Sequence, residues 1–173
     1  MYSVDHRDKV VELHDVPQSS VGAPCPMILA REGSACLAYF LEKTPPGWDG
    51  SSVRILDTET ADEPVALVAF THLRAHLFGP NDEAFSGHPL ASRGLKPYRV
   101  FEIIESSWIR SIERMNSVHP YHRPELFAEL RHFVFAFHDS TFECVSRSFS
   151  VAMHEGSVAG VLTEAFQGAL KSS

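Results

Sequence analysis

The chain has 173 residues, of which 44% are hydrophobic and 21% are charged. This composition is typical of a globular protein, and the length suits one domain, so disordered and fibrous architectures are excluded. The formal net charge of −7 opposes binding to nucleic acid, because contacts to phosphates need clustered Lys and Arg.

The cysteines and the N-terminus indicate a cytoplasmic setting. The three cysteines are odd in number and lack the CxxC spacing of a thiolate metal site. No apolar run is long enough to span a bilayer, and the opening residues MYSVDHRDKVVELHDV lack the apolar region of a secretion signal. We therefore expect neither a membrane partner nor secretion.

The first half of the chain predicts strands. Residues 1–26 have weak periodicity and end in the turn-rich PQSSVGAPCP, so we expect a weakly structured N-terminal arm. A hairpin follows around Gly33 and Ser34, and a further strand is predicted over 51–57. Residues 64–78, PVALVAFTHLRAHLF, alternate from residue 69 onward as a half-buried strand does, which predicts one long strand.

The second half combines strands and helices. A strand is predicted over 98–104, and helices at about 107–117, 124–131 and 157–170 are indicated by apolar spacing and by capping residues. The order of these elements predicts an α+β fold. We expect a mostly antiparallel sheet of about six to seven strands with the helices packed on one face, in a single domain of residues 1–173.

The stretch HFVFAFHDSTFECV, residues 132–145, predicts a hairpin that carries candidate catalytic residues. With Asp139 and Ser140 at the turn, the phenylalanines and Cys144 share one face of the sheet. His138 and Glu143 then lie diagonally near each other on the opposite face, so we expect them to act as an acid/base pair. A helix that begins with Ser140 and Glu143 as a capping box is the competing interpretation.

The long loop from Gly79 to Pro97 is a candidate ligand-binding segment, because unstructured loops of this length are often functional. Its carboxylates can accept hydrogen bonds, Arg93 can bind an anion, and His88 can exchange protons. The predicted ligand-binding residues are Asn81, Asp82, Glu83, His88 and Arg93. A solvated surface loop is the alternative.

The sequence HPYH, residues 119–122, is a candidate metal site. His119 and His122 lie within one turn of each other, and imidazoles bind divalent ions such as zinc. These histidines can equally cap the ends of the two neighbouring helices.

Our leading hypothesis is a small cytoplasmic enzyme that uses acid/base or metal-assisted chemistry on a small polar or anionic molecule. Its pocket would be lined by His and carboxylate side chains. One alternative is a non-catalytic module that binds a protein partner or an apolar ligand. Another is a structural homodimer, in which the strand over 64–78 presents a free edge.

Overall fold

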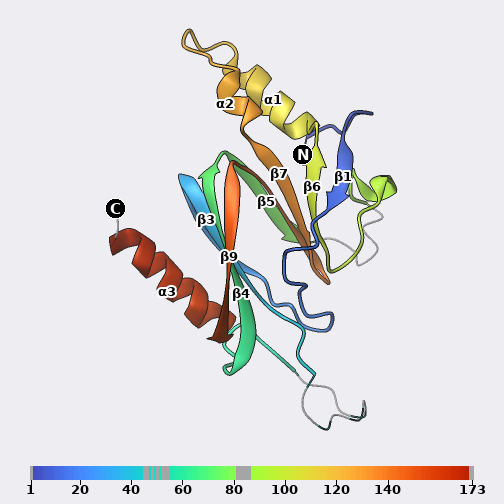
Figure 1. Cartoon of the computed structure of the whole chain (residues 1–173), viewed down its shortest axis with the longest axis vertical. Coiled ribbons are helices and arrows are strands. Elements are labelled where there is room, and N and C mark those ends of the chain that lie inside the picture. The colour runs from blue at the N-terminus through green and yellow to red at the C-terminus, as the bar shows by residue number, and fades with distance from the viewer. Residues whose placement is uncertain are drawn as a thin grey trace.

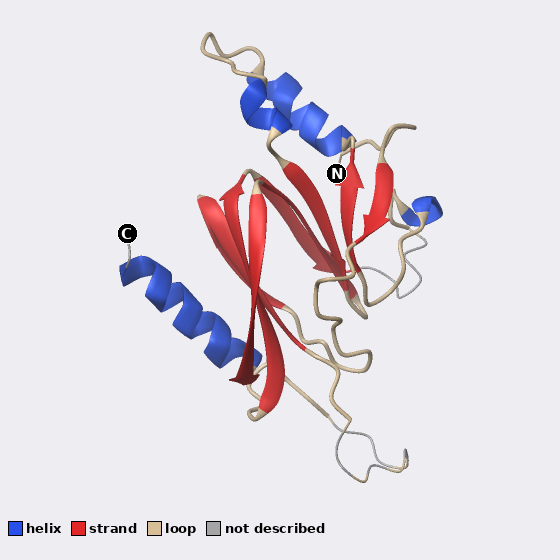
Figure 2. Cartoon of the chain, in the orientation of Figure 1, coloured by secondary structure: helices blue, strands red, loops and turns tan. Residues whose placement is uncertain are grey.

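The computed structural model describes residues 2–44, 47, 49, 51, 55–80 and 87–171. Within them the chain forms two antiparallel sheets, three α-helices and one 3-10 helix (Figure 1 and Figure 2). The five-stranded sheet has the order β1-β6-β7-β8-β5, and the four-stranded sheet has the order β2-β3-β4-β9.

The elements have the following bounds. The five-stranded sheet contains β1 (Lys9–Glu12), β6 (Val100–Ile104), β7 (Arg131–Ala136), β8 (Ser140–Ser146) and β5 (Ala75–Pro80). The four-stranded sheet contains β2 (Met27–Arg31), β3 (Gly33–Phe40), β4 (Glu63–Leu73) and β9 (Ser148–Gly156). The helices are η1 (Ala91–Arg93), α1 (Ser107–Asn116), α2 (Glu125–Ala128) and α3 (Val158–Lys171).

The α+β class is confirmed, but the expectation of one sheet with all helices on one face is wrong. The strands divide into two sheets, and α3 packs on the four-stranded sheet, while α1 and α2 lie at one end of the five-stranded sheet (Figure 2). The hairpin around Gly33 is confirmed as β2–β3. The segment expected to be a weakly structured arm contains β1, which pairs with β6. In the strand predicted over 51–57, residues 52–54 lie outside the described part of the chain and residues 55–57 form no strand.

Two long chain segments bend from one sheet into the other. The segment predicted as a single strand over 64–78 divides at Arg74 into β4 and β5, and the segment after the hairpin divides at Arg147 into β8 and β9. The Arg74 amide donates to the carbonyl of Val145 at 2.8 Å, and the Arg147 amide donates to that of Thr71 at 3.1 Å. Because both bends occur at the same corner, the two sheets diverge from a shared pair of strands.

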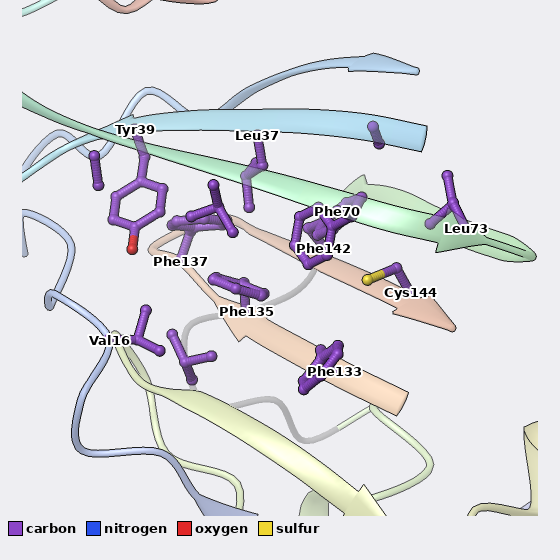
Figure 3. Close-up of a cluster of buried hydrophobic side chains, with 14 residues drawn as sticks. Val16, Leu37, Tyr39, Phe70, Leu73, Phe133, Phe135, Phe137, Phe142 and Cys144 are labelled. Atoms are coloured by element: carbon purple, nitrogen blue, oxygen red, sulfur yellow. The ribbon is translucent and has the colours of Figure 1, made fainter. Parts of the chain in front are cut away.

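Aromatic side chains fill the space between the sheets. Phe70 on β4 contacts Phe142 on β8, with ring centroids 5.4 Å apart, and Phe133, Phe135 and Cys144 lie beside them (Figure 3). The predicted facing of the hairpin is confirmed, because all of its phenylalanines and Cys144 are buried in this core.

The turn of the hairpin lies one residue earlier than predicted. Phe135 pairs with Phe142, and the Phe137 amide donates to the carbonyl of Ser140 at 2.9 Å. His138 and Asp139 therefore occupy the centre of the turn, whereas Asp139 and Ser140 were expected there. The odd and even positions keep their predicted faces, because the register moved by an even number of residues.

Both outer sheet faces are covered by further elements. Val158 and Leu162 of α3 pack on the outer face of the four-stranded sheet, against Phe40 and Val65. On the outer face of the five-stranded sheet, Leu90 packs with a group of strand residues: Phe101, Ile103, Val134 and Ala136. No helix in the described part of the chain is long and apolar enough to cross a membrane.

Candidate functional site

Glu143 is a carboxylate buried on the outer face of the five-stranded sheet. It lies in the middle of β8, with Val134 of β7 and Leu77 of β5 directly opposite. Its neighbours in the strand, Phe142 and Cys144, point into the core, so alternation directs Glu143 to the other face. Glu143 is only 4% exposed, and a charge buried to this extent needs hydrogen-bond partners.

Three side chains donate to this carboxylate, and two of them come from distant parts of the chain. His88 Nε2 lies 2.9 Å from Oε1, and His132 Nε2 lies 3.1 Å from Oε2. The Tyr2 hydroxyl donates to Oε2 at 2.7 Å. We call Tyr2, His88, His132 and Glu143 the Glu143 cluster.

His132 is fixed by α1. It lies on β7 and is fully buried, and its Nδ1 is 2.9 Å from the hydroxyl of Ser106, the N-cap residue of α1. The Ser106 hydroxyl oxygen also accepts the amide of Ile109 at 3.3 Å, so its hydrogen is available to Nδ1. This arrangement leaves the ring proton of a neutral His132 on Nε2, directed at Glu143.

His88 is fixed by the turn that leads into η1. The Leu90 amide donates to His88 Nδ1 at 3.1 Å, so a neutral ring carries its proton on Nε2. That proton points to Glu143 Oε1. Both imidazoles therefore act as oriented donors, and all four of their ring nitrogens have partners.

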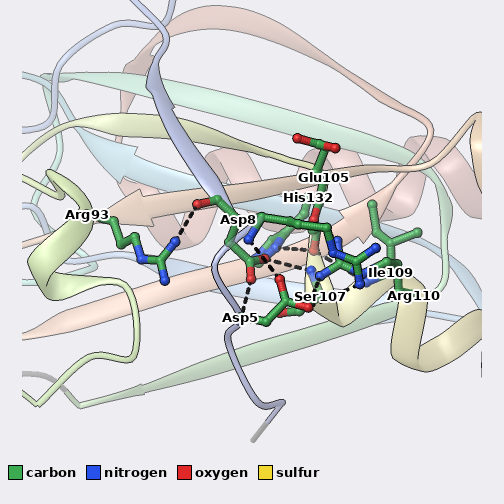
Figure 4. Close-up of polar contacts among 10 residues, drawn as sticks. Asp5, Asp8, Arg93, Glu105, Ser107, Ile109, Arg110 and His132 are labelled. Atoms are coloured by element: carbon green, nitrogen blue, oxygen red, sulfur yellow. Dashed lines mark hydrogen bonds and ion pairs between the residues drawn. The ribbon is translucent and has the colours of Figure 1, made fainter.

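The N-terminal segment supplies the third donor. The Tyr2 ring stacks on Trp108, with centroids 5.0 Å apart and planes 8° from parallel. Asp8 holds the segment in place, because its carboxylate accepts the Ser107 amide at 2.6 Å and the Asp5 amide at 2.8 Å. Figure 4 shows Asp5 and Asp8 beside the start of α1.

The electrostatics keep Glu143 ionised. Burial raises the pKa of its carboxyl, but the hydrogen bonds from His132 and His88, together with the electrostatic attraction of the two rings, outweigh this effect and lower the pKa to about 2. Burial and the adjacent Glu143 carboxylate raise the pKa of Tyr2. At neutral pH the cluster therefore combines a carboxylate with a protonated phenol.

A cleft of ≈ 470 Å³ opens beside the Glu143 cluster. We call it the β5–β8 cleft. Its described lining residues are Leu77, Phe78, Gly79, Pro80, Gly87, His88, Thr141 and Glu143. Glu143 and His88 thus belong both to the buried cluster and to the wall of the cleft.

A larger groove of ≈ 620 Å³ lies between α1, α2 and β6. Its arginines are engaged with carboxylates: Arg131 binds both oxygens of Glu102, and Arg110 binds Asp5 at 2.6 Å. It reaches none of the Glu143 cluster. The smaller β5–β8 cleft is the better candidate site, because it reaches a buried titratable group.

The predicted pairing of His138 with Glu143 is corrected. His138 lies in the hairpin turn, where its Nδ1 is 2.8 Å from the Asp139 carboxylate and its ring faces Tyr98. The imidazoles that contact Glu143 are instead His88 and His132. A catalytic role for either residue stays a prediction.

The predicted ligand-binding residues are divided by the structure. His88 lies at the cleft, whereas the Arg93 guanidinium donates to the backbone carbonyl of Asp8 at 2.9 Å. Asn81, Asp82 and Glu83 lie outside the described residues.

The predicted metal site is not supported. His119 Nδ1 accepts the Tyr121 amide at 3.1 Å, and His122 Nδ1 lies 2.9 Å from the side-chain oxygen of Asn116. Across the described ranges, no group of three or more His, Cys, Asp or Glu side chains is arranged to hold a metal ion. The histidines of HPYH instead stabilise the connection between α1 and α2.

Comparisons with protein-family models, with curated proteins and with solved structures find no significant match.

Proposed function

We propose that the protein binds a small organic molecule in the β5–β8 cleft, and that the Glu143 carboxylate accepts a hydrogen bond from it. The observation that carries this proposal is a buried carboxylate, held ionised by two imidazoles, in the wall of a cleft of ≈ 470 Å³. Pockets for small molecules commonly combine apolar walls with a few oriented polar groups.

The chemistry of the cleft favours a ligand that carries a hydrogen-bond donor. Among the described residues, His88 is the sole donor to Glu143 Oε1, and a carboxylate oxygen accepts two hydrogen bonds. The neighbouring walls are apolar at Leu77, Phe78 and Pro80. An apolar body with an amine or hydroxyl fits these features, and a protonated amine gains most from the negative charge.

An anionic ligand, which the sequence suggested, is disfavoured by the same features. A second negative charge near Glu143 would be repelled in a site of low dielectric constant. Arg93, which was expected to bind the anion, donates to Asp8 instead.

Acid/base catalysis in the same cleft is the second candidate. It is favoured by one observation, the position of His88 and Glu143 side by side in the cleft wall. Two features weigh against it. A carboxyl with a pKa of about 2 is a weak base at neutral pH, and each imidazole nitrogen already has a partner. Binding is therefore the function that the geometry supports best.

Benzylamine, benzyl alcohol and benzoate form a matched set of probes, because they share a ring and differ in charge. Titration of the ¹⁵N-labelled protein should give saturable shifts at the amides of Leu77, Thr141 and Glu143. We expect benzylamine to bind more tightly than benzyl alcohol, and benzoate to bind weakest.

A variant that obstructs the cleft provides the control. Leu77 is partly exposed at the cleft, so Leu77→Trp should block binding without unfolding the sheet. Ile55→Trp, at a position that is 93% exposed, should leave binding unchanged. The proposal is wrong if none of the three probes gives saturable shifts at the cleft, or if benzoate binds best.

A further inference from the structure

Each sheet leaves two strands at its edges, and three of these four edges are short or carry features that hinder pairing with another chain. β1 has four residues and contains Lys9. β2 has five residues, follows Pro26 and ends at Arg31. β5 has six residues and ends at Pro80. Short edge strands, charges and prolines are the usual means by which proteins avoid pairing through their edges.

β9 is the longest of the four edge strands, and Glu155 near its end is its one acidic residue. It has nine residues, contains no Lys, Arg or Pro, and pairs with β4 along its whole length without a bulge. Within the part of the chain that the structure describes, β4 is its single neighbour in the sheet. The opposite side of β9 therefore presents a long, regular row of backbone donors and acceptors.

We propose that β9 pairs antiparallel with β9 of a second copy of this chain, about a two-fold axis at Val151. Such pairing would join the two four-stranded sheets into one continuous sheet. The proposed binding function does not enter into this inference, because the β5–β8 cleft lies on the other sheet.

The apolar side chains of β9 favour this register. Phe149, Val151 and Met153 share the face of β9 that packs towards the core between the sheets. Met153 is nevertheless 65% exposed, and Phe149 and Val151 are only partly buried. An antiparallel copy centred on Val151 sets Met153 opposite Phe149 of the second copy, where a thioether and a ring pack favourably.

The charges at the two ends of β9 favour the same register. Arg147 directly precedes the strand and Glu155 lies near its end, both exposed. Pairing about Val151 brings Arg147 towards Glu155 of the second copy, and symmetry repeats this contact. A register centred on Ala152 would instead set Phe149 opposite Glu155. The occupant that matches both the apolar and the charged residues of β9 is therefore β9 itself.

Sedimentation equilibrium over a range of protein concentrations tests this proposal. The wild-type chain should approach twice its mass of 19.2 kDa as the concentration rises. Ser150 and Ala152 are exposed on the outer face of β9. In the proposed dimer, Ser150 of each copy lies opposite Ala152 of the other. Ser150→Lys/Ala152→Lys should therefore keep the chain monomeric through repulsion between four lysines. Ala30→Lys, at an exposed position on the β2 edge, is the matched control and should dimerise as the wild type does.

A charge exchange tests the register itself. Glu155→Arg should raise the dissociation constant of the dimer about tenfold, because it places like charges opposite each other twice. Arg147→Glu/Glu155→Arg should restore the wild-type constant. Loss of the exposed Arg147–Glu129 pair should matter little for folding, and far-UV circular dichroism with thermal melts verifies that each variant folds.

A wild-type chain that stays monomeric at every concentration would overturn the proposal, including the case in which β9 accepts a strand from a different protein. A dimer that survives Ser150→Lys/Ala152→Lys would also overturn it, because that dimer uses another surface. A charge exchange that fails to restore dimerisation would rule out the register about Val151.

Discussion

Glu143 and Cys144 are adjacent in β8, but their side chains point to opposite faces of the sheet. Cys144 is fully buried among phenylalanines, whereas Glu143 accepts hydrogen bonds from Tyr2, His88 and His132 on the opposite face. A buried carboxylate with three donors stabilises the fold only while it is ionised, so its contribution depends on pH.

The pKa of Glu143 fixes the direction of that dependence. Its value is lowered from 4.5 to about 2 in the folded chain, so the stabilisation is complete above pH 4.5 and is lost as the pH falls towards 2. By linkage, ionised Glu143 stabilises the folded chain by about 3 kcal/mol at neutral pH. Glu143→Gln should lower the free energy of unfolding at pH 7 and flatten its change between pH 4.5 and 2, as measured by urea denaturation.

Glu105→Gln is the matched control for this prediction. Glu105 is exposed and its pKa is lowered chiefly by a hydrogen bond from Lys9, at 2.6 Å. Because exposed ion pairs contribute little, this variant should unfold as the wild type does. An equal loss of stability in both variants would show that burial of Glu143 is not what matters.

At the scale of residues, the sequence predicts which face of a strand a side chain occupies better than it predicts which residues that side chain contacts. Alternation in the hairpin correctly directs Phe133, Phe135 and Cys144 inward and Glu143 outward. His132 shares the even-numbered positions of β7 with Val134, so alternation along the strand indicates its proximity to Glu143. His88 and Tyr2 reach Glu143 through contacts across 55 and 141 residues of sequence, which no local pattern encodes.

At the scale of elements, the bends at Arg74 and Arg147 explain why one long strand was predicted over 64–78. Alternation continues through the bend, because both halves are strands. His72, just before the bend, has a φ of 53°, a left-handed conformation that is rare for residues other than glycine. The residue composition around His72 does not indicate a turn. The helices, whose apolar spacing is local, were placed within a few residues, apart from the shorter α2.

The terminal helix α3 provides a test of how the four-stranded sheet is covered. Leu162 is 1% exposed against this sheet, and its neighbour Thr163 is exposed. Leu162→Ala should lower the free energy of unfolding by about 2–5 kcal/mol, because it removes buried methyl groups and leaves a cavity. Thr163→Ala should change it by less than about 0.5 kcal/mol. Chemical denaturation of both variants makes the comparison, and similar small losses would mean that α3 does not seal this face.

At the scale of the whole molecule, the core between the sheets should open only when the sheets separate. Cys144 lies in that core, whereas Cys25 and Cys36 are partly exposed near α3. Burial raises the pKa of all three thiols, which slows their reaction with alkylating agents. The three thiols therefore report on different openings of the fold.

Under native conditions, iodoacetamide should label Cys36 and Cys25 well before Cys144. If Cys144 reacts only through global unfolding, its labelling should be at least about a thousandfold slower than in urea. Mass spectrometry of peptides after timed quenching measures each site separately. Labelling of Cys144 at the rate of Cys36 would contradict a sealed core between the sheets.

The hydrogen bond from Tyr2 to Glu143 has a consequence for the order of events during synthesis on the ribosome. It joins residues 141 positions apart, and β1 similarly pairs with β6 far along the chain. Tyr2 and β1 leave the ribosome before β8 does, so they wait without their final partners until β8 has emerged. Contacts of such long range also slow folding, because a large loop must close before they form. The segment that completes the Glu143 cluster is thus made before its partners and placed among the last.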